Sequence, residues 1–461
     1  MSGQRRSAGT AAPSADRHRR RPRRRTGRWI AIAVAVLVLG TAATGGWLYS
    51  HLSGNIQGAD VDDALGGDRP KAAAGGENIL VIGSDSREGL GDAYGKHLTT
   101  MQSDTLMLLH TGGDGKWASV VSFPRDSWVL IPSCARGDGP ASTPHRFKIN
   151  EAYAIGGSTG DSVKAAACAI KTVEANTHVR IDHFLIADFR GFTGMVNALG
   201  GVEVCPKQDI HDSKAHLDLK AGCQLVRDDK ALGYVRARYS IGDGSDIGRI
   251  GRQQEFMKSL AARAKSKLYS PTALYGFLDS ATKSLTADPE LADIKPLTSL
   301  AGSLKGMATD RISFLTVPNY PRELDVPTDK ANVTWQQPAA RNLFTAMNED
   351  RETTPAALKA ATAELPAPAG TVRVTVLNGT GTQGKALKVA EELRAFGFQI
   401  AATGNAPAEV SKTTLTYPQD QAKQAASLAA RLPGLTPTPA APDAPAGITL
   451  TIGPDLPPTS G

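Results

Sequence analysis

Three of the arginines, one carboxylate and one amide in a short stretch of the sequence have a spacing that could bring them to one ligand. Arg236 and Arg238 alternate with apolar residues, so an extended strand would place both guanidinium groups on the same side. Asp246, Arg249 and Gln253 follow at intervals of three and four residues, which places them on one face of a helix. Because guanidinium stays charged and binds phosphate oxygens in pairs, the stretch predicts a site for a ligand with two or more phosphates. The alternative is a solvated basic surface with one or two ion pairs.

Two aspartates mark the ends of two predicted strands. An apolar run over 79–82 breaks before Asp85, and Asp104 opens a second apolar run over 105–109. If the two strands pair antiparallel, the carboxylates meet at one edge of the sheet and form a site for Mg²⁺ beside substrate phosphates. The alternative is that both aspartates are turn or cap residues.

Two further basic residues stand at predicted element boundaries. Arg125 comes directly after a third predicted strand, over 118–123. Open α/β sheets bind ligands at the carboxyl ends of their strands, which favours Arg125 as a ligand-binding residue. Lys148 opens a predicted helical stretch that continues through Tyr153.

Strands and helices alternate along the chain, which predicts an α/β fold with a sheet covered by helices. Helices are expected over 162–175, 189–199, 252–267, 271–285, 291–304 and 338–347, and strands over 182–187, 202–204 and 312–317. A smaller α/β unit is expected, with strands over 372–377, 399–403, 414–417 and 448–452 and helices over 385–396 and 419–432. The predicted boundaries are a basic tail over 1–28, a transmembrane helix over 29–49, a linker over 50–76, a main domain over 77–348, a linker over 349–370, a C-terminal domain over 371–453 and a tail over 454–461. Ordered structure is expected to begin at Glu77.

The N-terminal tail holds most of the excess positive charge. Residues 1–28 contain ten arginines and one aspartate, which leaves 42 basic and 44 acidic residues in the rest of the chain. The body therefore has no overall field for nucleic acid, and no nucleic-acid partner is predicted. The 21 uncharged residues over 29–49 are long enough to cross a bilayer. Arginines before this span predict a single-pass plasma-membrane protein with a cytoplasmic N-terminus and an extracytoplasmic body. A cleaved signal peptide is the alternative, but its apolar run is usually shorter.

The four cysteines all follow the predicted span, in a compartment that favours disulfides. Four cysteines allow three pairings. Cys205 and Cys223 are near in sequence and flank a polar segment, so Cys205–Cys223 with Cys134–Cys168 is the favoured pairing. Buried free thiols are the alternative.

A glycine pattern in the C-terminal domain resembles a dinucleotide-binding fingerprint. Gly379, Gly381 and Gly384 follow a predicted strand and open a predicted helix. However, the next strand ends in Thr403 without an acidic residue for a ribose, and so short a domain cannot hold both nucleotide-binding halves. The pattern is therefore interpreted as a tight turn, and no NAD is predicted.

Five motifs follow one another along the chain: NILVIGSDSR over 78–87, SDT over 103–105, SFPRD over 122–126, KINEAY over 148–153 and the stretch over 232–254. Their order, together with the predicted membrane anchor, resembles that of the LytR-CpsA-Psr family. The resemblance covers about residues 77 to 265. A separate C-terminal domain found on some members resembles residues 371–453, which include VLNGT over 376–380.

The family resemblance implies an extracytoplasmic phosphotransferase with an α/β/α sandwich and a mixed central sheet. Its donor would be a glycan on a polyprenyl-pyrophosphate carrier in the lipid bilayer, and its acceptor a sugar hydroxyl of peptidoglycan. Asp85 and Asp104 would hold Mg²⁺, with Mn²⁺ as the substitute ion, and Asp246 would orient Arg249 or accept the hydroxyl proton. Many members have an arginine where this chain has Gln102, which changes the charge on the metal side of the site. The pyrophosphate would be bound by Arg125, Lys148, Arg236, Arg238, Arg249 and Gln253.

Three other functions are alternatives to this one. A hydrolase would release glycan phosphate to water from the same site. A noncatalytic binder would recognise the lipid-linked glycan, with its C-terminal domain on wall polymer or a partner. A membrane-tethered regulator would use the arginine-rich tail on nucleic acid, but the tail lacks interleaved aromatic residues, and basic residues before a span are explained by topology.

Overall fold

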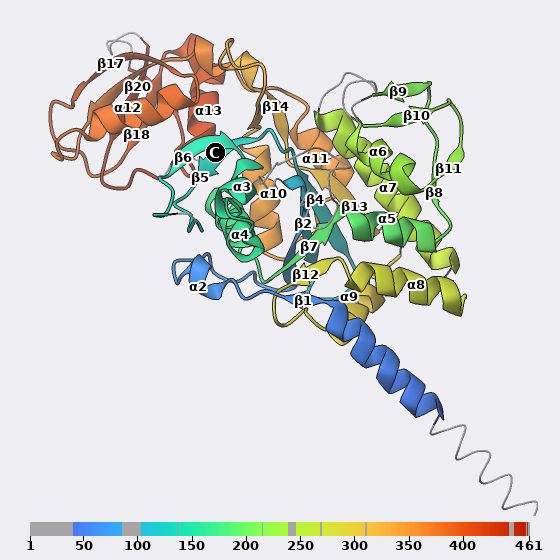
Figure 1. Ribbon diagram of the computed structural model, residues 1–461. Coiled ribbons are helices and arrows are strands. Elements are labelled where there is room, and N and C mark those ends of the chain that lie inside the picture. The colour runs from blue at the N-terminus through green and yellow to red at the C-terminus, as the bar shows by residue number, and fades with distance from the viewer. Residues whose placement is uncertain are drawn as a thin grey trace, which may run out of the picture. The chain divides into compact units, whose positions relative to one another are not determined.

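The computed structural model describes residues 40–84, 103–137, 139–213, 215–237, 246–267, 270–308, 311–441, 447–457 and 459 (Figure 1). The chain divides into two compact units, Met1–His51 and Leu52–Gly461. In the first unit, residues 40–51 are helical. Within the described ranges, no helix combines the length and the apolar character needed to cross a membrane. Residues 29–39 lie outside those ranges, so the span over 29–49 stays a prediction.

A seven-stranded mixed sheet forms the centre of the second unit. Its strands are β1 Gln57–Gly58, β2 Glu77–Ser84, β3 Ser103–Thr111, β4 Ala118–Phe123, β7 His183–Asp188, β12 Leu285–Ala287 and β13 Ile312–Thr316, in the order β1-β12-β7-β2-β3-β4-β13. β2 runs parallel to β7 and antiparallel to β3, and β4 runs antiparallel to β3 and parallel to β13. The carboxyl ends of β2, β7, β4 and β13 therefore share one edge with the start of β3. The predicted α/β class with a mixed sheet is confirmed.

Helices cover both faces of this sheet (Figure 1). They include α3 Glu151–Gly156, α4 Ser162–Thr177, α9 Ile294–Gly306 and α10 Ala339–Asn348. Alternate residues of a strand point to opposite faces. Leu80 and Ile82 of β2 are buried in a cluster with α4 and α10, whereas Ile79 belongs to a cluster with α9. The apolar alternation of β2 thus determines which helices pack on each side.

A third apolar cluster is built from helices and two small sheets. Its elements are α5 Phe189–Ala198, α6 Asp228–Arg236, α7 Asp246–Lys267, α8 Pro271–Thr282, β8 Val202–Val204, β9 Ile210–Asp212, β10 Leu217–Leu219 and β11 Gln224–Val226. Phe192 and Tyr234 both lie against Phe256 of α7, with ring centroids 5.3 Å and 6.3 Å away. These aromatic contacts join α5, α6 and α7.

The strand predicted through Arg236 and Arg238 is wrong, because Arg236 is the last residue of α6. Asp228 and Asp229 occupy the first turn and Arg236 the last, which is the charge order that the helix dipole favours. Four consecutive residues, 231–234, are buried, whereas a strand with one buried face would bury alternate residues. Arg238 lies outside the described residues.

The segment before β2 belongs to the folded unit, so the expectation that ordered structure begins at Glu77 is wrong. It contributes β1 and the short helix α2 Asp62–Leu65. Ala59, Val61 and Leu65 are buried in the same cluster as Leu80. The Gly and Asp content that indicated a linker was outweighed by these few apolar residues, which gain more from burial in the core than from solvation.

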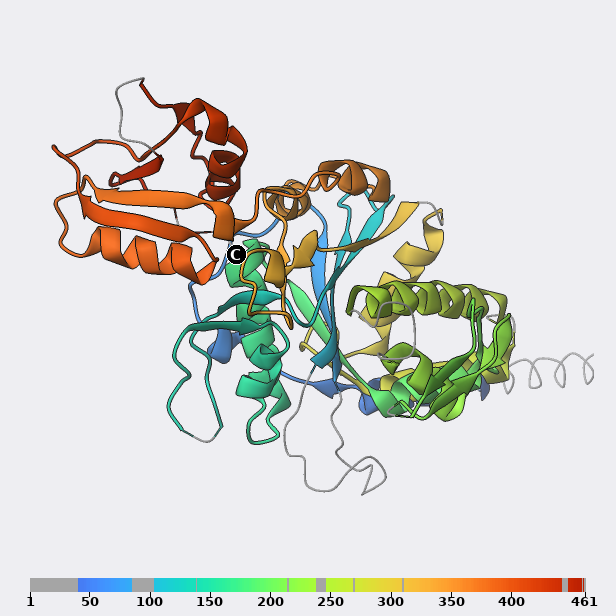
Figure 2. The same ribbon diagram turned by 90° about the horizontal axis from the view of Figure 1, so that it is seen from above.

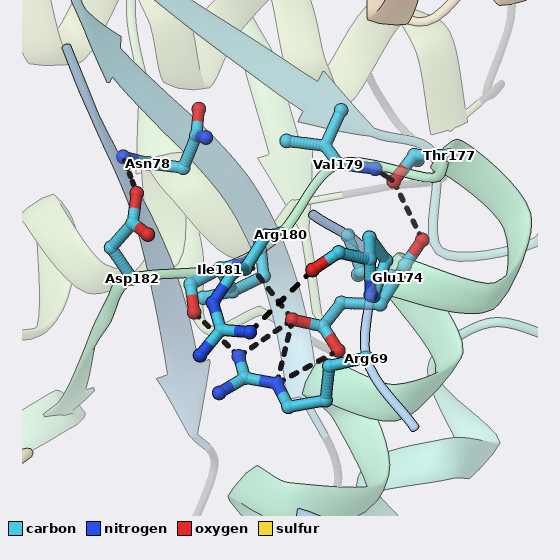
Figure 3. A network of polar contacts seen from close by, with 10 residues as sticks. Arg69, Asn78, Glu174, Thr177, Val179, Arg180, Ile181 and Asp182 are labelled. Atoms are coloured by element: carbon cyan, nitrogen blue, oxygen red, sulfur yellow. Dashed lines mark hydrogen bonds and ion pairs between the residues drawn. The ribbon is translucent and has the colours of Figure 1, made fainter. Parts of the chain in front are cut away.

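A buried ion pair fixes this segment to α4 (Figure 3). Nη2 of Arg69 lies 2.6 Å from Oε1 of Glu174, and the two side chains are only 12% and 4% exposed. The same guanidinium donates to the carbonyl of Ile181 at 2.6 Å, and the Glu174 carboxylate accepts the Ile181 N–H at 2.9 Å. Asp182 accepts the N–H of Asn78 at 2.9 Å. The network therefore joins the segment, α4 and the amino ends of β2 and β7.

Both predicted disulfides are present, Cys134–Cys168 and Cys205–Cys223. Cys134 and Cys168 are buried, and their bond ties α4 to the loop that follows strand β5 Trp128–Ile131. Cys205 and Cys223 directly flank β8 and β11, which pair antiparallel. Each bond therefore joins chain segments that the fold already places side by side.

The C-terminal domain has its own apolar core. Its elements are β16 Arg373–Asn378, α12 Lys385–Ala395, β17 Gln399–Asn405, β18 Thr414–Tyr417, α13 Ala422–Ala430, β19 Thr438–Pro439 and β20 Ile448–Ile452, and the sheet order is β17-β16-β20-β18-β19. The four expected strands and the two expected helices are all present, and β19 is a further short strand between α13 and β20. Gly381 and Gly384 have φ of 69° and 78°, so they form the turn before α12. The predicted linker over 349–370 contains the helix α11 Pro355–Ala361.

A histidine–aspartate pair gives the main domain a pH-dependent contact. Nδ1 of His183 lies 3.1 Å from Oδ1 of Asp288, whose second oxygen accepts the N–H of Phe184 at 3.1 Å. The hydrogen bond to Asp288 raises the pKa of His183 above 6.5. Burial acts to raise the pKa of Asp288, but the hydrogen bonds from His183 and Phe184 outweigh it and hold this pKa below 3.8. The pair is therefore fully charged at mildly acidic pH.

The variant His183→Gln is expected to lose stability mainly at mildly acidic pH. Because the folded pKa of His183 is raised, its contribution is fully present below pH 6.5 and is lost as the pH rises through that folded pKa. The contribution of Asp288 is present above pH 3.8 and is lost at lower pH. We expect the melting temperature of the wild type to exceed that of the variant by about 2 °C at mildly acidic pH, and by less in alkaline buffer. A difference that stays constant from acidic to alkaline buffer would contradict this assignment.

Candidate functional site

A cluster of charged side chains follows β4 at the carboxyl edge of the sheet. Asp126 is only 4% exposed. Its Oδ1 accepts a hydrogen bond from Nζ of Lys148 at 2.6 Å and lies 3.8 Å from Nε of Arg125. The backbone supports this arrangement, since the N–H of Ile149 donates to the carbonyl of Ser127 at 2.9 Å. The structure therefore brings the predicted residues Arg125 and Lys148 together around one buried carboxylate. The sequence analysis gave Asp126 no role. The feature of the sequence that could have indicated one is its position directly after Arg125.

Lys148 lies at the end of a strand. It closes β6 His145–Lys148, which pairs antiparallel with β5 so that Trp128 lies opposite Lys148. The helix α3 begins only at Glu151, so the expectation that Lys148 opens the helix is wrong. Alternation of basic and aromatic residues over 145–148 favours a strand, and this strand ends where the chain returns to the carboxyl edge.

The predicted helix that carries Arg249 and Gln253 is confirmed as part of α7. Arg249 and Ile250 are both 4% exposed. Gln254 anchors the helix to the carboxyl edge, because its Nε2 donates to the carbonyl of Leu315 at 3.1 Å and lies 3.3 Å from Oγ of Ser122. Arg249 is five residues earlier, which is about 7.5 Å along a helix. Arg249 therefore lies within about two helical turns of a residue that is anchored at that edge.

Hydrogen bonds from α7 also hold the end of α6. Nε2 of Gln253 donates to the carbonyl of Val235 at 3.1 Å, and Arg252 donates to the carbonyl of Ala237. Arg236 is therefore held beside α7 by the last turn of a helix. The structure places Arg236, Arg249 and Gln253 on two adjacent helices. Asp246 begins α7, but its side chain, like Arg238, lies outside the described part.

The two predicted metal ligands are attached to neighbouring strand ends. β2 and β3 pair antiparallel, which is the condition on which the predicted metal site depends, and Ser84 lies opposite Ser103 at the last pair of the ladder. Asp85 and Gln102 lie outside the described residues, and Asp104 is described only by its backbone in β3. Within the described residues, the one group with metal-ligand spacing is Glu203 with Cys205 and Cys223. Its cysteines form a disulfide and so offer no thiolate.

The protein is thus of the mixed-sheet α/β class. Its cationic side chains lie at the carboxyl edge of the sheet, which is where open α/β sheets bind their ligands. The model of the LytR-CpsA-Psr family matches residues 48–351. A second model, described as LytR cell envelope-related transcriptional attenuator, matches residues 371–456. The first match covers more than half of the sequence, and the chain belongs to the LytR-CpsA-Psr family.

Curated relatives include proteins of cell wall biosynthesis. The chain is 32% identical over 286 residues to the probable cell wall biosynthesis protein LcpB of Corynebacterium glutamicum, covering 60% of this chain and 62% of that protein. It is 28% identical over 409 residues to the cell wall biosynthesis protein LcpA of the same organism, covering 81% of this chain and 75% of LcpA. It is 27% identical over 311 residues to the polyisoprenyl-teichoic acid–peptidoglycan teichoic acid transferase TagT of Bacillus subtilis, covering 64% and 88%. The chain thus spans less than two thirds of the length of LcpB.

A solved structure was also matched. The LytR-Csp2A-Psr enzyme from Actinomyces oris is 18% identical to the chain with a TM-score of 0.46, and the match covers 64% of this chain and 96% of that one.

Proposed function

We propose that this protein is a glycopolymer phosphotransferase that acts on the outer side of the plasma membrane. It takes a glycan from a polyprenyl-pyrophosphate carrier and attaches it to a sugar hydroxyl of peptidoglycan. The observation that carries the proposal is the group of Arg125, Asp126 and Lys148 at the carboxyl edge, on the same edge as the paired strand ends Ser84 and Ser103. The name of the relative TagT, a teichoic acid transferase to peptidoglycan, supports the same class of reaction.

The reaction exchanges one phosphorus–oxygen bond for another. The acceptor oxygen attacks the phosphorus next to the glycan, and the bond from that phosphorus to the bridging oxygen breaks. Polyprenyl monophosphate leaves with the electron pair, and the hydroxyl proton passes to a base, for which Asp246 is the candidate. Such transfers depend mainly on positioning and on neutralising charge on the phosphate oxygens. Arg125, Lys148 and Arg249 would supply that positive charge.

The other predicted arginines would extend the same pyrophosphate site. Arg236 would bind from the end of α6, and Arg238 from the residues that follow it. The amide nitrogen of Gln253 already donates to the carbonyl of Val235. Its contribution is therefore to hold the end of α6, and with it Arg236, against α7.

Asp85 and Asp104 would hold Mg²⁺, with Mn²⁺ as the substitute ion. The two residues follow Ser84 and Ser103, which lie opposite each other in the sheet, and hard carboxylate oxygens suit these ions. When bound, the ion would offset negative charge on the pyrophosphate. We expect EDTA to abolish turnover of the donor, and excess Mg²⁺ to restore it.

The proposed location is a single-pass anchor in the plasma membrane with a cytoplasmic N-terminus. The basic tail over 1–28 and the uncharged run over 29–49 support it. An anchored enzyme would meet its lipid-linked donor at the membrane surface.

The proposal is tested with the full chain in detergent micelles. The chain is incubated with a short polyprenyl-pyrophosphate glycan, peptidoglycan and Mg²⁺ in ¹⁸O-labelled water, and release of polyprenyl phosphate is followed. Transfer predicts release that depends on peptidoglycan and leaves no ¹⁸O on the glycan phosphate. Free glycan phosphate that carries ¹⁸O would identify a hydrolase, and tight donor binding without release would identify a noncatalytic binder.

A further inference from the structure

The strand pair that carries Lys148 contacts the C-terminal domain through stacked arginines. The guanidinium carbon of Arg146 on β6 lies 4.3 Å from the ring centroid of Phe396, which follows α12. On β5, the ring of Trp128 lies under Arg322, with 4.7 Å between guanidinium carbon and ring centroid. Trp128 is the cross-strand neighbour of Lys148. Both views of the molecule show the teal β5–β6 pair beside the orange C-terminal domain (Figures 1 and 2).

Arginines of the main domain also cap two helices of the C-terminal domain. Nη2 of Arg322 donates to the carbonyl of Ala395, the last residue of α12, at 2.6 Å. Nη1 of Arg341 donates to the carbonyl of Ala430, the last residue of α13, at 3.0 Å. Carbonyl groups at a helix C-terminus lack partners within the helix and carry partial negative charge. The two caps therefore fix how α12 and α13 face the main domain.

A second path runs from Arg322 to the charged cluster after β4. Nε of Arg322 donates to Asp329 at 2.8 Å, and the same carboxylate accepts the side-chain amide of Asn332. Within this segment the carbonyl of Ala331 accepts the Nζ of Lys148 at 3.2 Å. Lys148 is thus linked to the C-terminal domain both along β6 and through the segment over 329–332.

Among the described residues, the ring of Phe396 is the cation–π partner of the Arg146 guanidinium. Its Nη1 is buried there without a hydrogen-bond partner. Burial, and then the positive charge of Arg431, lower the pKa of Arg146 to about 10, so the group is still a cation at neutral pH. A cation removed from water gains most from an aromatic face. Phe396 is 2% exposed, so its ring is held rigidly for this contact.

We propose that Phe396 and Arg146 are positioning residues for the site at the carboxyl edge, which rests on the function proposed above for that site. The C-terminal domain holds the β5–β6 pair so that Lys148 stays against Asp126 and faces the pyrophosphate of the donor. Lys148 would contact the donor directly, whereas Phe396 and Arg146 act through the strand that carries it.

The test compares full-chain variants in detergent micelles by hydrogen exchange and donor kinetics. Arg146→Met keeps the length of the side chain without its charge and leaves the C-terminal core intact. We expect the amides over 145–150 to exchange about fivefold faster and the KM for the donor to rise about fivefold, with a smaller change in kcat. Arg146→Lys keeps a cation over the ring. It should therefore restore part of the slow exchange over 145–150 and part of the low KM for the donor. Phe396→Leu should resemble Arg146→Met.

Arg394→Met is the matched control. Arg394 is an exposed arginine near the end of α12, the helix that Phe396 follows. It should match the wild type in both measurements. Exchange over 145–150 that is unchanged in Arg146→Met would overturn the inference, whatever the kinetics show. If the wild type transfers no glycan, the proposed function fails, and the exchange comparison alone then decides whether the C-terminal domain holds β6.

Discussion

Replacing Arg125 with alanine is expected to lower the rate of glycan transfer by about 10²–10³-fold. Arg125 follows β4 at the carboxyl edge and lies 3.8 Å from the buried Asp126 carboxylate that also binds Lys148. In the proposed reaction its guanidinium stabilises charge that develops on the phosphate oxygens, so kcat should fall more than donor affinity. The rate of adduct formation with saturating donor and peptidoglycan measures this effect.

The matched control is Arg227→Ala. Arg227 is an exposed arginine of the same domain that precedes α6, and its side chain makes no capping hydrogen bond. Its loss removes the same charge from the domain and should leave transfer within about twofold of the wild type. Equal losses in both variants would show that overall charge, and not a site at the carboxyl edge, supports the reaction. Full activity of Arg125→Ala with an unchanged melting temperature would remove Arg125 from the site.

Replacing Glu174 with alanine should destabilise the main domain by about 3 kcal/mol. The variant leaves Arg69 buried without its counter-charge, and it removes the acceptor of the Ile181 N–H (Figure 3). Amides of α4 that open only with the whole domain should therefore exchange about 100-fold faster. Glu174→Gln keeps an acceptor oxygen and should fall between the wild type and Glu174→Ala.

A partly exposed ion pair at the start of the same helix supplies the control. Lys164 and Asp161 lie 3.2 Å apart with side chains 35% and 31% exposed. Because solvent screens such pairs, Lys164→Ala should cost no more than about 0.5 kcal/mol. If both variants change exchange equally, the Arg69–Glu174 pair contributes no more than a surface contact and the segment before β2 is held by its apolar residues alone.

Local sequence patterns were sufficient for most elements of the sheet. β2 and β3 were predictable because each is an apolar run bounded by polar turn residues. Their antiparallel pairing was assumed as the condition for a metal site, and the structure contains it. The fold of residues 52–76 was not predictable in this way. Arg69 and Glu174 are far apart in sequence, and no local pattern indicates that they pair. Burial of Ala59 and Val61 likewise depends on the main core.

The candidate site was predictable in its residue types but only partly in its geometry. Arg125 lies at the carboxyl edge, as its place after a strand suggested. Lys148 lies beside the same Asp126 carboxylate, although it was expected to open a helix and instead ends a strand. Arg249 lies on the helix that was predicted to carry it. The alternation around Arg236 was misleading, because it extends over too few residues to outweigh the helix that begins at Asp228. Asp126 was missed because its role depends on Lys148, which only the β5–β6 pairing brings near.

Transfer of the glycan to peptidoglycan is tested most directly by detecting the product on peptidoglycan itself. The full chain in detergent micelles is incubated with a short polyprenyl-pyrophosphate glycan, peptidoglycan and Mg²⁺, and the digested muropeptides are examined by mass spectrometry. Glycan transfer predicts a muropeptide that carries the glycan through a phosphodiester, absent with EDTA and strongly reduced in Arg125→Ala. Complete consumption of the donor without any such muropeptide would contradict it.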